Sequence, residues 1–561
     1  MKLKLMCIFI VIITLTTLIT GCNENEQNTD DINQGENNGE TVSIDTVGTE
    51  NENTETTPVT PEVENITTIE LSDTSIKVDG KSITHDINKA VYLDYDIIFY
   101  EEGNGFIYGE GTENDEHSRK EASTHSVVHI SKPGTYKLEG KLSKGQIAID
   151  LGEEAILNKD SKVEVILNNV DITCEIAPAI IVYNAYECGT TVKDLLSNNV
   201  DTTNAGITIR IADDSINNIH GSYVSRIYDP ETVESMYDVI LEAETLHDYA
   251  GAIHSKMSLN ICGDKLNNGV LNIKGEKEGL HSGLHLTING GVINITSENN
   301  GINTSLDDVS VTTLNSGEVN ISVIGENSAG DGINSAGWIV INGGKITACA
   351  SELDEHLGFD SVKGTHINGG EVIATGNMYS DLEINTKLGK PQTYAVFTFS
   401  KQLGNGEYII KNNNDSTEII KATIENKFNY LLVSSDKLTD GEYAIEFNSE
   451  ELQVVKTETF TDFESLEQIE DQTNITDDNE TSEDIETSDD IETSDDEILE
   501  DEASEDVDAS EDVDASEDET SEDAESENDK SEDTTNLEDE NTTEYNKTFI
   551  IEGISNFFIV K

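Results

Sequence analysis

The sequence predicts an all-β protein, a right-handed parallel β-helix that a small antiparallel β module closes at its C-terminal end. The first observation is a five-residue phrase, apolar at its centre, whose copies centre on residues 253, 280, 302, 333 and 362, at spacings of 27, 22, 31 and 29 residues. The second is an Asn-Gly-Gly phrase, or a close variant, that falls between them. Repeats of this length indicate stacked units that bury their apolar faces on one another. The copies of the first phrase are Gly251-Ala252-Ile253-His254-Ser255, Glu278-Gly279-Leu280-His281-Ser282, Asn300-Gly301-Ile302-Asn303-Thr304, Asp331-Gly332-Ile333-Asn334-Ser335 and Asp360-Ser361-Val362-Lys363-Gly364.

Each repeat is expected to form strands and not a pair of helices. The Asn-Gly-Gly phrase at residues 289–291 precedes a short β-rich run, Val292 to Ile295, and the other copies have the same order. Asn and Gly tolerate left-handed backbone, which we expect at the corners of each coil. An antiparallel sandwich of short hairpins is the alternative, but it does not explain why two different phrases alternate.

The N-terminus predicts export and lipid anchoring. A basic head, Met1 to Lys4, precedes an apolar segment, Leu5 to Ile19, that is too short to cross a bilayer. The segment ends at Gly21-Cys22, which resembles a bacterial lipoprotein cleavage box, and the resemblance implies a lipidated Cys22 at the membrane. An ordinary signal peptide is the alternative. Residues 23–65 are rich in Asn, Glu, Thr and Gly and predict a disordered tether.

Composition restricts the partners and the chemistry. The formal net charge is −80, with 113 acidic against 33 basic residues, which argues against nucleic acid as a partner because phosphate binding needs clustered Lys and Arg. Apart from Cys7 and Cys22, four cysteines remain, and their spacing fits no zinc or redox pattern. We expect buried thiols at Cys174, Cys188, Cys262 and Cys349.

The folded region is expected to begin at residue 66, and residues 66–393 are assigned to the coil. Alternating runs such as Ser75 to Val78 predict strands early in this region. Residues 189–247 resemble an insertion. Within them, Val233 to Leu246 is compatible with a helix, and the spacing of Val233, Met236, Tyr237, Ile240 and Leu241 predicts a short amphipathic helix packed on the coil.

The motifs between residues 131 and 448 resemble a known family. They include residues 131–140, 163–174, 254–261 and 428–435 together with the repeated phrases. These motifs resemble the bacterial surface lipoproteins described as carbohydrate-binding domain-containing, which carry a pectate-lyase-like parallel β-helix. The resemblance implies a calcium-bearing β-helix that binds plant-type or acidic polysaccharide, without established turnover.

The C-terminal part has three sections. Longer alternating strands over residues 394–463 predict an antiparallel module that covers the open end of the coil. Residues 464–544 hold 39 Asp and Glu against Lys530 alone, which predicts a disordered acidic run. The last section, residues 545–561, is apolar again, and we expect it to return as strands on the module.

Aligned on their apolar centres, the phrases predict two columns of side chains along the coil, because stacked strands lie about 4.8 Å apart. One column holds Gly251, Glu278, Asn300, Asp331 and Asp360, and the other holds His254, His281, Asn303, Asn334 and Lys363. Carboxylates at that separation repel by roughly 3–4 kcal/mol at an effective dielectric near 20, so a column of oxygen ligands favours a bound cation. Calcium suits Asp, Glu and Asn oxygens. An exposed ladder of Asx side chains is the alternative. The predicted calcium ligands are Glu278, Asn300, Asp331 and Asp360, and the predicted polysaccharide contacts are His254, His281, Asn303, Asn334, Lys363 and Trp338.

Three functions fit these features. The first is a cell-surface lipoprotein, expected to be monomeric, that binds polysaccharide, including polyuronates bridged by calcium. The second is a polysaccharide lyase, for which Lys256 or Lys363 is the candidate base beside calcium. The third is a surface adhesin or structural protein of the cell envelope. No nucleophile elbow, phosphate loop or dinucleotide fingerprint occurs in the sequence.

Overall fold

The computed structural model describes residues 65–105, 107–189, 200–233, 243–325, 328–353, 355–377, 384, 390–457 and 546–561. Within these ranges the protein is all-β. One four-residue α-helix, α2 (Arg119–Ala122), and one 3-10 turn (Glu153–Leu157) are the only helices of the described residues. The predicted signal peptide with Cys22, most of the tether and the acidic run lie outside them. No helix in the described segments is both long and apolar enough to span a bilayer.

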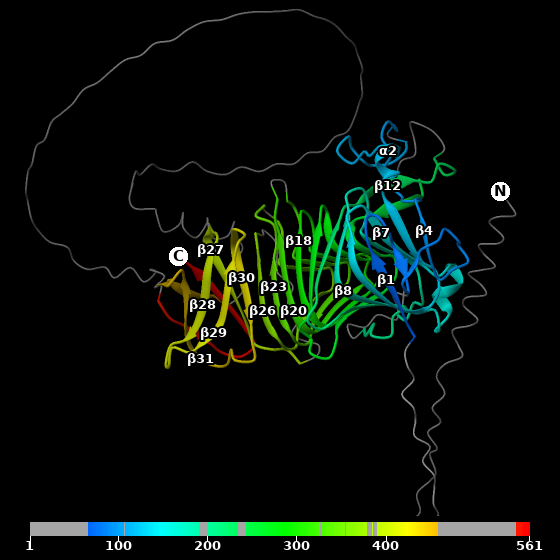
Figure 1. The fold of residues 1–561 in the computed structure, drawn as a ribbon. Helices are drawn as coiled ribbons and strands as arrows, with labels where there is room; N and C mark the ends of the chain where they lie inside the picture. Colours follow the sequence, from blue (N-terminus) through cyan, green and yellow to red (C-terminus); the bar gives the residue numbers. More distant parts are fainter. Residues whose placement is uncertain are drawn as a thin grey trace, which may run out of the picture. The chain divides into compact units, whose positions relative to one another are not determined.

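Three stacks of strands, here called sheets 1, 2 and 3, are built by successive passes of the chain (Figure 1). Sheet 1 is parallel from β5 to β24, and β4 (Val91–Asp94) adds to it antiparallel. One pass of the chain through the three sheets is here called one coil of the structure. Phe359 of β24 pairs with Ile333 of the preceding coil, and such pairs place corresponding positions of consecutive coils side by side. The strands of sheet 1 after β4 are β5 (Ser126–Ile130), β7 (Gly145–Asp150), β9 (Ile180–Asn184), β14 (Gly251–Ser255), β17 (Glu278–Ser282), β19 (Ile302–Thr304), β21 (Ile333–Ser335) and β24 (Phe359–Ser361).

Sheets 2 and 3 are continuous, because four long strands bend from one into the other: β6 (Gly134–Leu142), β8 (Val163–Cys174), β18 (Leu286–Ser297) and β20 (Val311–Val323). Sheet 2 also contains β1 (Ile66–Leu71), β10 (Ile207–Ile211), β15 (Leu259–Gly263), β22 (Trp338–Ile341) and β25 (Gly364–Ile367). Sheet 3 also contains β11 (Ile216–Gly221), β16 (Val270–Gly275), β23 (Lys345–Cys349) and β26 (Glu371–Gly376).

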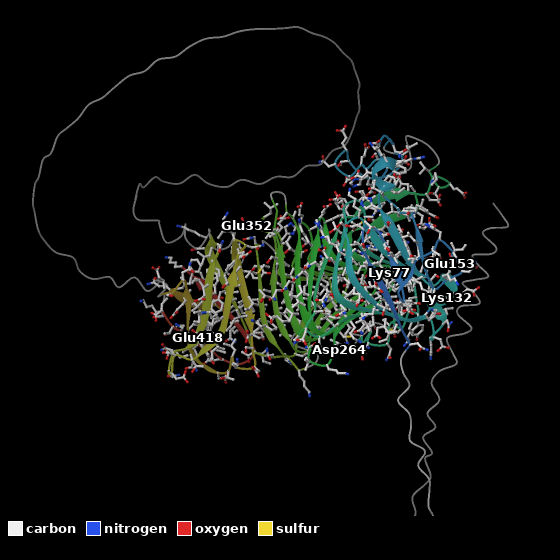
Figure 2. The ribbon with its side chains drawn as sticks, in the orientation of Figure 1. Lys77, Lys132, Glu153, Asp264, Glu352 and Glu418 are labelled. Atoms are coloured by element: carbon white, nitrogen blue, oxygen red, sulfur yellow. The ribbon has the colours of Figure 1, made fainter. Side chains whose placement is uncertain are left out.

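The interior between the sheets is apolar. Leu280, Ile302 and Ile333 from sheet 1 and Ile295 and Ile321 from sheet 3 are at most 2% exposed and belong to one core cluster. Each such side chain contributes about 1.5–3 kcal/mol on burial. Charged residues such as Lys132, Glu153, Glu352 and Glu418 instead lie around the outside of the ribbon (Figure 2).

Two features shape the corners between sheets 2 and 3: left-handed glycines and a ladder of hydrogen-bonded asparagine side chains. The second glycine of each Asn-Gly-Gly phrase is left-handed, with a φ of +89° at Gly291 and +93° at Gly344. Contrary to our expectation, the asparagines of these phrases are not left-handed, whereas Asn169 at the corner of β8 is, with a φ of +57°. They form a ladder in which Asn315 Nδ2 donates to Asn289 Oδ1 (2.8 Å) and Asn342 Nδ2 donates to Asn315 Oδ1 (2.9 Å). The ladder therefore links consecutive coils through side chains.

The insertion-like region is smaller than the sequence indicates. Its residues 207–221 form β10 and β11, which are ordinary strands of sheets 2 and 3. After them, β12 (Val224–Tyr228) and β13 (Thr245–Tyr249) form an antiparallel hairpin. The predicted helix lies mostly outside the described residues, and its C-terminal end, at Thr245 and Leu246, is a strand because it pairs with β12.

After β26 the strands pair mainly antiparallel. β30 (Phe428–Ser434) joins β26 to β27 (Tyr394–Leu403) and so connects the coil to a C-terminal module. The module also contains β28 (Gly406–Asn412), β29 (Glu418–Ile424), β31 (Gly441–Phe447) and β33 (Val454–Thr457). The last residues of the chain return to it: β34 (Phe549–Ile551) pairs with β31, and β35 (Ser555–Val560) lies between β27 and β33.

Candidate polysaccharide-binding face

The first repeated phrase forms the corner at which the chain enters sheet 1. In its second copy, Leu280 points into the core, and Gly279 precedes it because a Cβ there would lie 2.3 Å from a methyl group of Ile295. The residues on either side, Glu278 and His281, hydrogen-bond to each other through Oε2 and Nδ1 at 2.7 Å. The phrase therefore places a carboxylate or amide at the corner and a second polar side chain on the outer face of the strand.

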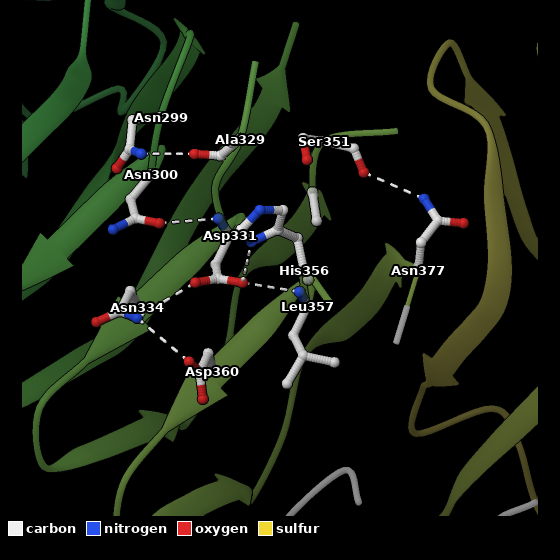
Figure 3. Close-up of polar contacts among 12 residues, drawn as sticks. Asn299, Asn300, Ala329, Asp331, Asn334, Ser351, His356, Leu357, Asp360 and Asn377 are labelled. Carbon is white, nitrogen blue, oxygen red and sulfur yellow. Dashed lines mark hydrogen bonds and ion pairs between the residues drawn. The ribbon is translucent and has the colours of Figure 1, made fainter. Parts of the chain in front are cut away.

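The corner positions of successive coils hold Glu278, Asn300 and Asp331, as the sequence predicts. Glu278 Oε1 accepts a hydrogen bond from Asn303 of the next coil (2.8 Å). Asn300 Oδ1 accepts one from the backbone N–H of Asp331 (2.8 Å), as Figure 3 shows. These carbonyl and carboxylate oxygens connect neighbouring coils.

Asp360 does not belong to the corner column. Its partner in the sheet is Asn334, whose Nδ2 donates to Asp360 Oδ2 (3.3 Å; Figure 3). The apolar residue of the fifth copy is Phe359, which is 2% exposed, whereas Val362 is 63% exposed. The predicted alignment of the fifth copy on Val362 was therefore wrong by three residues. The residue at the corner must be small, and in this coil that residue is Gly358, which packs against Ala374.

Lys363 is likewise outside the predicted column. It follows the strand, at the turn into sheet 2, and its ammonium pairs with Asp308 at 2.8 Å. The outer row of sheet 1 instead consists of paired positions from five consecutive coils: His254, His281, Asn303, Asn334 and Asp360. We call this the outer row.

Aromatic rings continue the outer row at its N-terminal end. The imidazoles of His254 and His281 stack with centroids 4.5 Å apart and an interplanar angle of 11°. Tyr249 lies against His254 at 5.2 Å, and Tyr183 meets Tyr249 edge-on at 6.0 Å. Tyr249 is 1% exposed and His254 is 3% exposed, so of these four rings only the half-buried Tyr183 and His281 have surface that a ligand could reach.

Burial sets the protonation of this ring cluster. His254 is 3% exposed, and its desolvation, followed by the effect of His281, lowers its pKa well below the ordinary value of 6.5. The ammonium of Lys256 lies 5.3 Å from the Tyr249 ring centroid and 5.7 Å from that of Tyr183. Although much of the Lys256 side chain is exposed, desolvation of the amine lowers its pKa. A neutral imidazole and a less basic amine thus lie next to each other.

The opposite end of the face is acidic and tightly bonded. Asp331 Oδ1 accepts from the backbone N–H of Leu357 (2.8 Å) and faces His356 Nδ1 at 3.6 Å (Figure 3). The nearby carboxylate of Asp331 is the main cause that raises the pKa of His356, and the charges of Glu355 and Asp360 add to it.

Trp338 lies apart from this face. It begins β22 of sheet 2, pairs with Gly364, and its ring is tilted against His366 at 5.1 Å. The predicted platform and the outer row therefore belong to different sheets.

The predicted calcium ligands do not all lie in one column, because Asp360 pairs with Asn334 and not with Asp331. Within the described ranges, no three His, Cys, Asp or Glu side chains are grouped so that they could hold a metal ion. The oxygens of Glu278 and Asp331 accept hydrogen bonds from the surrounding amides, and Asp360 stands in another column. Calcium would have to compete with these bonds.

Sequence reasoning did not find three residues that the fold adds to this face. Tyr183 comes from β9, His247 from the hairpin, where its Nδ1 lies 2.7 Å from Tyr249 Oη, and His356 from the loop before β24. None is part of the repeated phrase. Of the three, only Tyr183 could have been found, from the register of β9 against β14. That register depends on strand pairing, which cannot be read from the sequence.

The chain matches the family described as "Carbohydrate-binding domain-containing protein" over residues 124–520, more than half of its length, and it belongs to that family. No curated protein matches it. A solved structure titled "Structure of the polysaccharide lyase-like protein from C. thermocellum, Gadolinium derivative" is 18% identical, with 57% of this chain and 97% of that chain covered and a TM-score of 0.31.

Proposed function

We propose that this protein binds polysaccharide at the bacterial cell surface, along the outer face of sheet 1, and that its stacked coils constitute a right-handed parallel β-helix. The observation that carries the proposal is the outer row itself. Five consecutive coils each place one polar side chain on the same line, about 4.8 Å apart. A linear polymer of hydroxyl-rich units matches a linear series of hydrogen-bonding groups, and membership of the carbohydrate-binding family supports this ligand class.

Different members of the row have different tasks. Asn303, Asn334 and Asp360 are partly exposed and can bond sugar hydroxyls directly. His281 is held from three sides, by Glu278, by the His254 ring and by Ser305 Oγ at 3.1 Å from its Nε2. Almost no surface of His254 is available to a ligand, so it positions its neighbour. Such preorganisation lowers the entropic cost of binding.

Calcium and polyuronate stay predictions. The face carries Glu278, Asp331 and Asp360, which repel a uronate unless a cation lies between. We therefore propose polyuronate as a ligand only together with calcium, and neutral glycans as ligands without it. A glycan array with and without chelator tests this directly. Binding to neutral glycans should survive chelation, binding to uronates should not, and a failure to bind any glycan would refute the proposal.

Attachment to the membrane through a lipidated Cys22 also stays a prediction. Fractionation of cells that produce Cys22→Ala is the test: the variant should leave the membrane fraction if Cys22 is the anchor. If this protein binds no glycan but binds a protein partner at the cell surface, the third alternative, a surface adhesin, holds instead.

A lyase is the second candidate, because of Lys256. A lyase base removes the proton alpha to a uronate carboxylate, and an amine with a lowered pKa is suited to that step. Lys363 is ion-paired with Asp308 and does not contact this cluster. The expected signature is ultraviolet absorbance from unsaturated uronate, with calcium present, that Lys256→Ala abolishes. Absence of that absorbance across uronate polymers would leave a binding protein.

A further inference from the structure

We propose that the outer face of sheet 3 is a second polysaccharide site, which takes a neutral linear chain by hydrogen bonding alone. It goes beyond the proposed site on sheet 1, from which it differs in residues and in chemistry. Two cavities open on this face. One has a volume of about 360 Å³ and is lined by Asn218, His220, Asn272, Lys274, Asn294 and Thr296, with Ile219 and Ile273 below them.

The second cavity continues along the same sheet. It has a volume of about 350 Å³ and includes Asn320, Ser322, Lys345 and Thr347 of sheet 3. Strand β29 of the C-terminal module forms its wall, with Lys421 and Thr423 in the lining. Asn294 of the first cavity and Asn320 of the second are paired positions on neighbouring coils. The two cavities are therefore consecutive parts of one surface.

A row of amides runs through both cavities. Asn272 Nδ2 donates to Asn218 Oδ1 (2.9 Å), Asn294 Nδ2 to Asn272 Oδ1 (2.9 Å), and Asn320 Nδ2 to Asn294 Oδ1 (3.0 Å). Each internal bond uses one N–H and one carbonyl lone pair, and an amide has two of each. The bonds fix every amide in orientation, and the remaining donors and acceptors repeat at the strand spacing of about 4.8 Å.

The outer face of sheet 2, unlike that of sheet 3, is partly covered by another segment of the chain. Residues 200–203 lie over sheet 2, where Thr202 N donates to Thr287 Oγ1 (3.1 Å) and Asn289 Nδ2 donates to Thr203 Oγ1 (2.9 Å). On sheet 3 the amide row is left half-buried or exposed, and Lys274 beside it is exposed. Neither cavity lining contains an aromatic ring apart from the imidazole of His220. The linings also contain Lys274, Lys345, Lys421 and Glu425, but Lys345 is ion-paired with Glu318 and Lys421 with Glu407. Recognition along the row itself rests on amide and hydroxyl groups, which suits a neutral glycan.

The test separates the two sites with three variants. The sheet 1 variant, His281→Ala/Asn334→Ala, weakens the proposed primary site. Thr296→Arg adds bulk over the amide row at an outward, half-buried position, so it leaves the row's own hydrogen bonds in place. The matched control is Thr417→Arg, an exposed threonine in the β28–β29 turn outside both cavities.

Retention in affinity gels with soluble galactomannan, mixed-linkage β-glucan and polygalacturonate is the measurement. In the sheet 1 variant we expect residual retention by a neutral glycan, and adding Thr296→Arg should weaken it at least about ten-fold, whereas adding Thr417→Arg should not. No residual retention in the sheet 1 variant, while the wild type is retained, would overturn the second site alone. Retention unaffected by Thr296→Arg would also overturn it. So would light scattering that shows a wild-type dimer which Thr296→Arg dissociates and Thr417→Arg does not. A wild type that no glycan retains would overturn the proposed function as well.

Discussion

His254 illustrates how a polar residue on the outer face becomes part of the framework. Its ring lies between Tyr249 and His281, and its Nδ1 has no hydrogen-bond partner in the described structure. A buried imidazole in this position stays neutral because its charged form would lose hydration. The ring then stacks on His281 without charge repulsion, and this holds His281 against Glu278.

The titration of His254 predicts how stability responds to acid. The pKa is lower in the folded state than its ordinary 6.5, so the unfolded chain takes up the proton first. The stability that this group contributes is present above pH 6.5 and is lost as the pH falls toward the folded pKa. We expect His254→Gln to lose less stability than the wild type between pH 7.5 and pH 5 in chemical denaturation. An equal loss in both proteins would contradict a neutral buried ring.

The titration of His356 predicts that stability changes with pH in the opposite direction. Its pKa is raised by Asp331, so the folded chain keeps its proton longer, and the contribution is fully present below pH 6.5 and disappears as the pH rises through the folded pKa. His356→Gln should therefore destabilise the protein at pH 5.5 and have a smaller effect at pH 8.5. The same urea titration at both pH values measures this, and an effect that grows with pH would be inconsistent with the Asp331 pair.

At the scale of the element, the corner into sheet 1 depends on its glycine. A Cβ on Gly301 would lie 2.1 Å from a methyl group of Ile321, and the corresponding distance for Gly332 to Ala348 Cβ is 2.9 Å. Sheets 1 and 3 meet there with no room for a side chain. The phrase repeats because each coil has the same steric requirement.

Gly301→Ala is thus expected to destabilise the coil by about 1–3 kcal/mol, because the added methyl group overpacks the interior. Gly105→Ala is the matched control, since nothing lies within 4 Å of a Cβ at that position. Urea unfolding of both variants is the measurement. Equal stability of the two would mean that the corner relaxes freely.

The Asn ladder between sheets 2 and 3 makes a second prediction at this scale. Asn315→Ala removes the donor to Asn289 Oδ1 and the acceptor for Asn342 Nδ2, so it interrupts the ladder, although both neighbours keep their bonds to other residues. Because Asn342 is exposed and water can replace the lost bond there, we expect a loss of about 1 kcal/mol. Asn414→Ala, at an exposed turn, is the control and should have almost no effect. A loss of the same size in both variants would argue against the ladder.

These elements also explain what could be read from the sequence. Apolar centres, Asn-Gly corners and short β-rich runs are local features, so strands and corners were predictable in four of the five phrases. The fifth failed because Asp360-Ser361-Val362 imitates the phrase, while the deciding requirement, a small residue packed against Ala374, is a contact between coils. Tyr183 and His356 reach the face from outside the phrases, through pairing and loop geometry that the sequence does not encode locally.

At the scale of the whole molecule, the coil and the C-terminal module share hydrogen-bonded strands. β30 pairs with β26 of the coil and with β27 of the module, and β35 closes the module from the far end of the chain. Phe558 of β35 is 1% exposed and stacks on Phe397 at 5.2 Å. The last residues of the chain therefore complete a core that begins more than 150 residues earlier in sequence.

Phe558→Ala should consequently lower the free energy of unfolding by about 3–5 kcal/mol, since it leaves a large cavity in the core. Calorimetry of the full chain is the measurement, and the loss should appear in the transition that includes the C-terminal module. A transition unchanged by the substitution would show that the returning strands contribute nothing to it.

The central claim, that polysaccharide lies along the outer row of sheet 1, is tested most directly by affinity for a glycan that the wild type binds. We expect His281→Ala/Asn334→Ala to bind that glycan at least about ten-fold more weakly while it unfolds at the same urea concentration as Thr417→Arg, which should bind normally. Unchanged affinity in the folded double variant would contradict the account.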